Sequence, residues 1–90
     1  MTTIQIESLD ERTFRVTVAG QSVTEHRVTV SPAYHAKLTA GRVTAAELVK
    51  ASFEFLLQRE PNTSILRTFD LPVIGHYFPE YEKSIQERFG

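Results

Sequence analysis

The sequence predicts an α+β fold: a three-stranded antiparallel β-meander within residues 2–30, followed by helices within 32–89 that pack on one face of the sheet. Two periodicities predict it. Apolar residues alternate with polar ones in the first third, as in half-buried strands, and later recur every three or four residues, as in amphipathic helices. Ile4 and Ile6 indicate that the first strand is the shortest. Ninety residues with 41% hydrophobic and 23% charged content then form a single domain, 1–90.

The second and third strands are predicted from strict alternation over residues 13–18 and 24–30. The apolar faces of both strands must lie on the same side of the sheet. The residue numbers of two directly opposed residues must therefore add up to an even number. Pairing Val16 with His26 satisfies this condition and leaves an odd-length loop around Gly20. The register of the hairpin is therefore predicted as well as its existence.

The first helix is predicted from its two ends. Ser31 is a good N-cap residue, and Pro32 suits the first helical position because its missing N–H would have no partner there. We expect this helix to run to about Thr39. Gly41 then ends it, because glycine readily takes the left-handed conformation that follows a helix.

The central helix, about 44–60, has the clearest signals in the chain. Thr44 and Glu47 form a capping box at its start, and Pro61 ends it. On a helical wheel its apolar residues cover an arc of roughly 240°, whereas a helix on one sheet needs only about 100°. Two different parts of the protein must therefore cover this helix, and the sheet is only one of them.

The segment 69–82, FDLPVIGHYFPEYE, is too apolar for a surface loop and too interrupted for one long helix. It is predicted to be the second cover, a lid on the hydrophobic core. Before it, Asn62 is expected to cap a short helical turn. Within it, Asp70 is expected to cap a short helix with Pro72 in the first turn. A last helix is expected over about 79–89.

Composition narrows the function classes. The chain has no cysteine, so disulfides and thiolate chemistry are excluded, and its four glycines stand singly, so no nucleotide cofactor is expected. We also expect no membrane span, no signal peptide and a cytoplasmic location. The net charge of −1 comes with scattered basic residues, whereas nucleic-acid binding needs clustered ones. A net charge near zero also favours self-association mildly.

The first hypothesis is a small non-enzymatic protein-interaction module, acting as a homodimer or as an accessory to a larger partner. Aromatic side chains are enriched at binding hot spots, and an exposed group of them marks a docking surface. The alternative for each is burial in the core, because a wide apolar arc serves both purposes. The candidates lie on the central helix and around the lid: Phe55, Tyr34, Tyr77, Phe78 and Tyr81.

The second hypothesis is a nucleic-acid-binding regulator. Short consecutive helices are compatible with a helix-turn-helix, and Arg15 and Arg27 lie on the outer face of the predicted sheet. The alternative is a solvated sheet face, on which a residue such as Glu25 pairs with an arginine across the strands. Acidic residues spread over the helical part disfavour nucleic acid.

The third hypothesis is an enzyme or small-ligand binder. His76, Tyr77 and Glu80 are a group that could transfer protons, although the sequence supplies no nucleophile or orienting partner at a fixed spacing. The three histidines match no metal-ligand spacing, so no metal site is expected. His26 is expected at the sheet edge, partly buried and hydrogen-bonded, and His35 is expected to be exposed. Catalysis is therefore not the preferred interpretation.

Residues 44–82 also resemble a group of small bacterial proteins that have no assigned activity. The resemblance covers a little under half of the chain. It implies a bacterial, cytoplasmic, single-domain protein and transfers no catalytic residue. The stretches that carry it are 53–57, 59–61, 64–66, 69–71 and 77–81.

Overall fold

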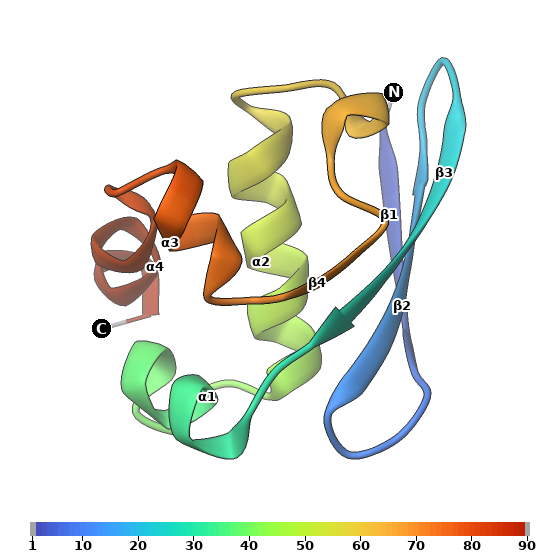
Figure 1. The fold of residues 1–90 in the computed structure, drawn as a ribbon. Coiled ribbons are helices and arrows are strands. Elements are labelled where there is room, and N and C mark those ends of the chain that lie inside the picture. The colour runs from blue at the N-terminus through green and yellow to red at the C-terminus, as the bar shows by residue number, and fades with distance from the viewer. Residues whose placement is uncertain (1, 90) are drawn as a thin grey trace.

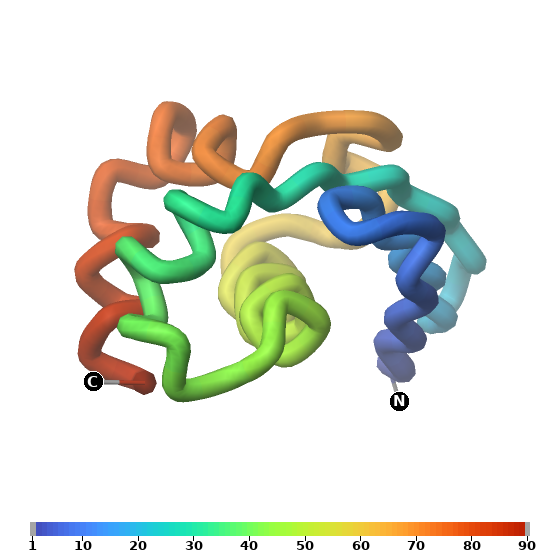
Figure 2. Tube along the Cα trace, turned by 90° about the horizontal axis from the view of Figure 1, so that it is seen from below, coloured from blue at the N-terminus to red at the C-terminus, as the bar shows by residue number. Residues whose placement is uncertain are grey.

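A computed structural model describes residues 2–89, in which a four-stranded sheet curves around one central helix (Figures 1 and 2). The predicted antiparallel meander is confirmed: β1 (Thr3–Ser8) pairs with β2 (Thr13–Ala19), and β2 pairs with β3 (Val23–Thr29). The sheet has one more strand than the sequence predicts, because β4 (Thr68–Asp70) adds to β3 in parallel. Strands therefore extend beyond the first third of the chain.

Helices pack on the concave side of this sheet (Figure 2). The central helix α2 lies between the sheet and the other helices, which agrees with the predicted architecture. No helix within residues 2–89 is long and apolar enough to cross a membrane. The helical elements are α1 (Pro32–Thr39), α2 (Ala45–Leu57), the 3₁₀ turn η1 (Asn62–Ser64), α3 (Val73–Tyr77) and α4 (Tyr81–Phe89).

The register of the predicted hairpin is confirmed. Val16 of β2 lies opposite His26 of β3, and on the other edge of β2 it lies opposite Ile6 of β1. Ala19 opposes Val23, so the loop between β2 and β3 has the expected odd length. Because alternate residues face the same way, the alternating apolar residues of the strands point toward α2, whereas Ala19 and the exposed Val23 lie on the other face. The sheet's contribution to the core is Phe14, Val16, Val18, Val28 and Phe69.

Both ends of α1 follow from local chemistry. The Ser31 hydroxyl accepts a hydrogen bond from the Tyr34 amide at 3.1 Å, as an N-cap residue should. The helix ends after Thr39, as predicted. The left-handed turn starts one residue before the predicted glycine, at Ala40 with φ 53°, and Gly41 continues it with φ 72°.

The start of α2 is as predicted, but its end is not. The Thr44 hydroxyl accepts from the Glu47 amide at 3.1 Å. The helix stops at Leu57 instead of reaching the predicted 60, and residues 58–60 form a turn. Pro61 is the physical reason, because a proline ring disfavours helical geometry in the preceding residue.

The prediction that α2 is covered from two sides is confirmed by its two buried phenylalanines. Phe53 faces the sheet, where its ring lies 5.3 Å from the His26 ring and 6.1 Å from the Phe69 ring. Phe55 faces away from the sheet, and its ring lies 5.2 Å from the ring of Tyr81 in α4. The C-terminal part of the chain therefore supplies the second cover.

The segment 69–82 is the lid that the sequence predicts. Leu71, Ile74 and Tyr81 are all buried in the same core cluster as α2. Figure 1 shows the segment crossing α2 as β4 and then turning through α3 into α4. Its prolines and glycine allow these changes of direction within a few residues.

Two predicted caps of this region were wrong. Asp70 lies in β4 rather than at a helix start, and its carboxylate accepts a hydrogen bond from the Thr29 hydroxyl of β3. Pro72 precedes α3, which has no side-chain cap. Asn62 does not cap η1 either; its amide reaches the β2–β3 hairpin. In both cases a partner distant in sequence replaces the local backbone partner.

Candidate functional site

The outer edge of β4 is open. Its pairing with β3 is fixed by the Arg27 amide, which donates to the Arg67 carbonyl at 2.6 Å, and by the Leu71 amide, which donates to the Thr29 carbonyl at 2.9 Å. Since backbone groups alternate in direction along a strand, those of Thr68 and Asp70 point away from β3. Within residues 2–89 these outward N–H and C=O groups have no hydrogen-bond partner.

An apolar groove of about 380 Å³ runs beside this edge, on the side of the sheet that faces α2. We call it the edge groove. Glu60 and Ser64 supply its polar side chains, and all its other lining residues are apolar or aromatic. It is lined by Leu56, Glu60, Ser64, Ile65, Leu66, Phe69, Val73, Ile74, Tyr77 and Phe78.

Two large apolar side chains of the edge groove remain accessible to solvent. Leu66 is 47% exposed and Tyr77 is 64% exposed. A second hollow lies on the opposite side of β4 and shares Leu66, Phe69 and Val73 with the first. The edge of β4 is therefore accessible from both faces of the sheet. An open strand edge beside an apolar groove is the arrangement that binds extended peptide segments in known recognition domains.

A buried polar network holds the chain just before β4. His26 Nδ1 lies 2.7 Å from the Leu66 carbonyl oxygen, and His26 Nε2 lies 2.8 Å from the Thr24 hydroxyl. The Asn62 amide donates to that hydroxyl at 2.9 Å and to the Ser22 carbonyl at 3.0 Å. The network ties the segment 62–66, which precedes β4 and lines the edge groove in part, to the β2–β3 hairpin.

The network is satisfied only by neutral His26. A carbonyl can only accept, so Nδ1 carries the proton toward Leu66, and Nε2 accepts from the Thr24 hydroxyl. Burial lowers the pKa of His26, the hydrogen bond to Leu66 opposes this shift, and the nearby charge of Arg67 lowers the pKa further. The residue was expected to be partly buried at the sheet edge, but it is fully buried, because β3 is an inner strand and the Phe53 ring lies 5.3 Å from the His26 ring.

Three of the five predicted interaction residues belong to the core. Phe55, Tyr34 and Tyr81 are buried, so none of them presents its ring at the surface of this domain. Tyr81 lies fully inside, with its hydroxyl 2.6 Å from the Ser52 hydroxyl of α2. Burial also raises the pKa of Tyr81 above its ordinary range.

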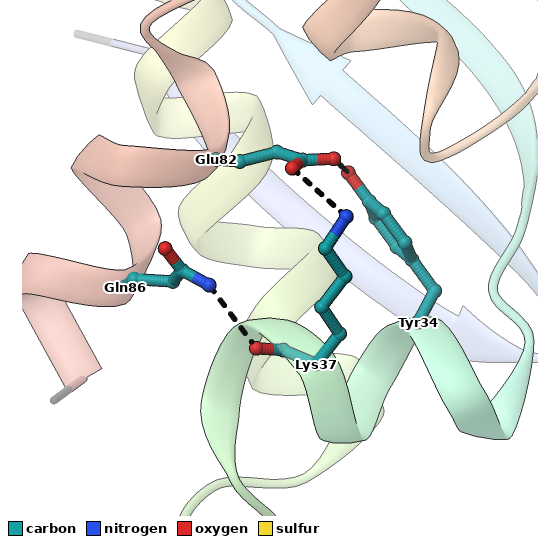
Figure 3. Close-up of polar contacts among 4 residues, drawn as sticks. All are labelled: Tyr34, Lys37, Glu82 and Gln86. Atoms are coloured by element: carbon teal, nitrogen blue, oxygen red, sulfur yellow. Dashed lines mark hydrogen bonds and ion pairs between the residues drawn. The ribbon is translucent and has the colours of Figure 1, made fainter.

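Tyr34 joins α1 to α4 through a small polar cluster (Figure 3). Its hydroxyl donates to Glu82 at 2.8 Å, and Lys37 pairs with the same carboxylate at 3.1 Å. The hydrogen bond from Tyr34, followed by that from Lys37, lowers the pKa of Glu82. Burial raises the pKa of Tyr34. Gln86 donates to the Lys37 carbonyl at 3.3 Å, so the whole cluster fastens two helices together.

The other two interaction candidates do reach the surface. Tyr77 and Phe78 both line the edge groove, Tyr77 as a largely exposed ring and Phe78 as a half-buried one. Phe78 also packs against Phe55 with ring centres 5.9 Å apart. Leu66 was not among the predicted site residues, and only its position in the resembling stretch 64–66 singled it out.

The predicted group of His76, Tyr77 and Glu80 is not assembled into a site. His76 is exposed, contacts the Tyr77 ring edge-on at 6.0 Å, and does not line the edge groove. Glu80 pairs instead with Arg59 at 3.3 Å. The Arg59 guanidinium lies 3.5 Å from the centre of the Phe55 ring, so this ion pair covers the core.

The other histidine, His35, was expected to be exposed but is half-buried. Its Nε2 lies 2.6 Å from the Val43 carbonyl oxygen and so ties α1 to the loop that follows it. Throughout residues 2–89, no three acidic or histidine side chains converge as a metal ion would require.

The two arginines proposed for nucleic acid lie directly opposite each other on the outer sheet face. Arg15 pairs with Glu7 at 3.1 Å and with Glu25 at 3.5 Å, which is the solvated cross-strand pairing that the sequence offered as the alternative. Arg27 forms no ion pair within the described chain. On this face Arg15 is therefore paired twice and Arg27 is not ion-paired within residues 2–89.

No protein-family model matches the chain, and comparisons with curated proteins and with solved structures give no match either.

Proposed function

We propose that this protein is a small, non-enzymatic interaction module that binds another polypeptide at the edge groove and the open edge of β4. One observation carries the proposal: the unpaired backbone groups of Thr68 and Asp70 lie beside an apolar groove. An extended chain added here would gain backbone hydrogen bonds from β4 and place alternate side chains in the groove.

The exposed rim of the edge groove supports the same proposal. A bound chain would cover Leu66 and Tyr77 together and so remove their apolar surface from water. Tyrosine is also enriched at binding hot spots because its ring is large and its hydroxyl stays hydrated. The catalytic alternative lacks comparable support, since Glu80 is engaged by Arg59 and His76 lies outside the groove.

The nucleic-acid alternative receives less support than the interaction proposal. Glu7 and Glu25 surround Arg15 on the outer sheet face and compensate its charge. Phosphate binding gains affinity from several uncompensated cations acting together.

A selection from a random 12-residue peptide library displayed on phage tests the proposal. We expect enriched peptides whose affinity falls at least ~10-fold when Tyr77→Ser or Leu66→Ser removes one rim side chain. Val23→Ser is the matched control, because Val23 is 70% exposed on the β2–β3 hairpin and does not line the groove. No enrichment, or equal losses with all three variants, would reject the edge groove as a polypeptide site.

A further inference from the structure

We infer that the polypeptide bound at β4 is a second copy of this chain, joined by antiparallel pairing of the two β4 strands about a two-fold axis at Phe69. The inference rests on the proposed function and names its partner. It follows from the direction of the open backbone groups, the extent of β4 and an arginine beside it, Arg27, that has no ion pair within residues 2–89.

The backbone of β4 is self-complementary. Only Thr68 and Asp70 direct their N–H and C=O groups outward, and they flank Phe69 symmetrically. In antiparallel pairing, Thr68 of one copy and Asp70 of the other form a hydrogen-bonded pair that exchanges both N–H···O=C bonds. The two-fold axis repeats this exchange, so every outward group of β4 finds a partner.

The ends of β4 fix the register of this pairing. Arg67 and Leu71 direct their backbone groups toward β3, and Pro72 has no N–H to continue a ladder. Pairing centred on Phe69 is therefore the register that uses both open residues. The two Phe69 rings then lie opposite each other on the groove side, where cross-strand aromatic pairs are favourable. The exposed Leu66 of each copy comes opposite Pro72 of the other.

The outer face of the sheet supplies charge complementarity. Arg27 lies beside Thr68 in the sheet and has no ion pair within residues 2–89. The proposed register places Asp70 of the second copy beside Thr68, about 10 Å from Arg27, since neighbouring strands are about 4.8 Å apart. An extended arginine and an aspartate together span that distance. The contact also draws Arg27 away from Arg15, which lies directly opposite it.

The overall charge does not oppose association. Two copies with a net charge of −1 each repel only weakly. The interface is isologous, as in most two-subunit proteins, because the same patch serves both copies.

Light scattering or sedimentation equilibrium from about 10 µM to 1 mM protein tests the inference. We expect the mass to rise with concentration from 10.2 kDa toward twice that value. Thr68→Pro should weaken dimerisation at least ~10-fold, because it removes an outward N–H that the chain itself does not use. Thr68→Val keeps that N–H and is the matched control, with unchanged dimerisation.

A charge exchange gives a second test that does not depend on proline being tolerated at position 68. Arg27→Asp and Asp70→Lys should each weaken the dimer several-fold, and the double variant should restore it. A protein that stays monomeric at 1 mM overturns the inference, as does a dimer that none of these variants weakens. If the chain is monomeric while selected peptides still bind through Tyr77, the second copy is rejected and the proposed function stands.

Discussion

Two regions cover α2 on the side away from the meander, and they differ in how completely they close. The region around α4 is sealed: Tyr81 and Phe55 are buried against each other, and Ser52 satisfies the Tyr81 hydroxyl. The region between β4 and α3 is left open, with Leu66 and Tyr77 exposed over the edge groove. The same lid segment contributes to both regions.

The difference separates residues that hold the fold from residues that are free to bind. In the sealed region, each aromatic ring has a partner inside the chain, so its burial already contributes to folding. In the open region, Leu66 and Tyr77 are largely exposed, and the outward backbone groups of β4 have no hydrogen-bond partner in the described residues. We expect substitutions in the first region to change stability and substitutions in the second to change association.

The largest expected effect separates two tyrosines of the lid. Tyr81→Ala should lower the free energy of unfolding by about 3–5 kcal/mol, because it empties a fully buried site. Tyr77→Ala should change it by less than about 0.5 kcal/mol, because its ring is mostly in solvent. Urea denaturation of both variants measures the difference. Equal losses would mean that the two regions are not distinct.

A smaller effect is expected from the polar contact inside the sealed region. Ser52 donates its proton to the Leu48 carbonyl at 2.8 Å, so the Tyr81 hydroxyl donates to Ser52. Ser52→Ala leaves a buried donor unsatisfied and should cost about 1–3 kcal/mol, and Tyr81→Phe should cost about 1 kcal/mol. The double variant should cost less than the sum. Additive losses in a double-mutant cycle would contradict the contact.

The smallest expected effect concerns pH and acts on the open region through His26. Its pKa is lowered in the folded protein, so below the unfolded-state value of about 6.5 the unfolded chain binds more protons. Stability should therefore fall as the pH drops below 6.5, and level off beneath the folded pKa. The lowered pKa of Glu82 adds a separate loss only below about 4.5.

Urea denaturation at pH 7.5 and at pH 5.5 measures how much the free energy of unfolding of the wild type falls between the two pH values. His26→Asn should remove this loss of stability. His76→Asn is the control and should keep the loss, because His76 is exposed. An NMR titration of the His26 ring gives an independent reading. A midpoint at or above 6.5 would contradict the buried neutral network.

Much of the fold could be predicted because its signals are local and long. The alternation in β2 and β3 fixed even the pairing of Val16 with His26, since a slip by one residue would turn the apolar face outward. The ends of α1 and the start of α2 followed from Ser31 and Thr44. The end of α2 was predicted at residue 60 instead of Leu57, because a proline also disfavours helical geometry in the residues that precede it.

The open site could not be predicted because its strand has no local signal. Three residues, Thr68–Asp70, are too few to show alternation, and they are extended because β3 offers them backbone partners. Without β4, the lid appeared as helices alone. A wheel of the central helix gives the direction of Phe55 but not what covers it. Tyr77 and Tyr81 lie in the interrupted lid, where no long periodicity separates the exposed ring from the buried one.

The central claim is that the outward edge of β4 is open in one copy and is covered by another chain. Amide hydrogen exchange of Thr68, Asp70 and Leu71, measured by NMR at about 20 µM and 1 mM, tests it most directly. We expect the Leu71 amide to be protected at both concentrations, since it donates to Thr29. The Thr68 and Asp70 amides should exchange rapidly in dilute solution and slowly in concentrated solution. Protection of Thr68 and Asp70 in a dilute sample whose measured mass is that of the monomer would contradict the open edge, and rapid exchange in both samples would contradict its pairing with a second copy.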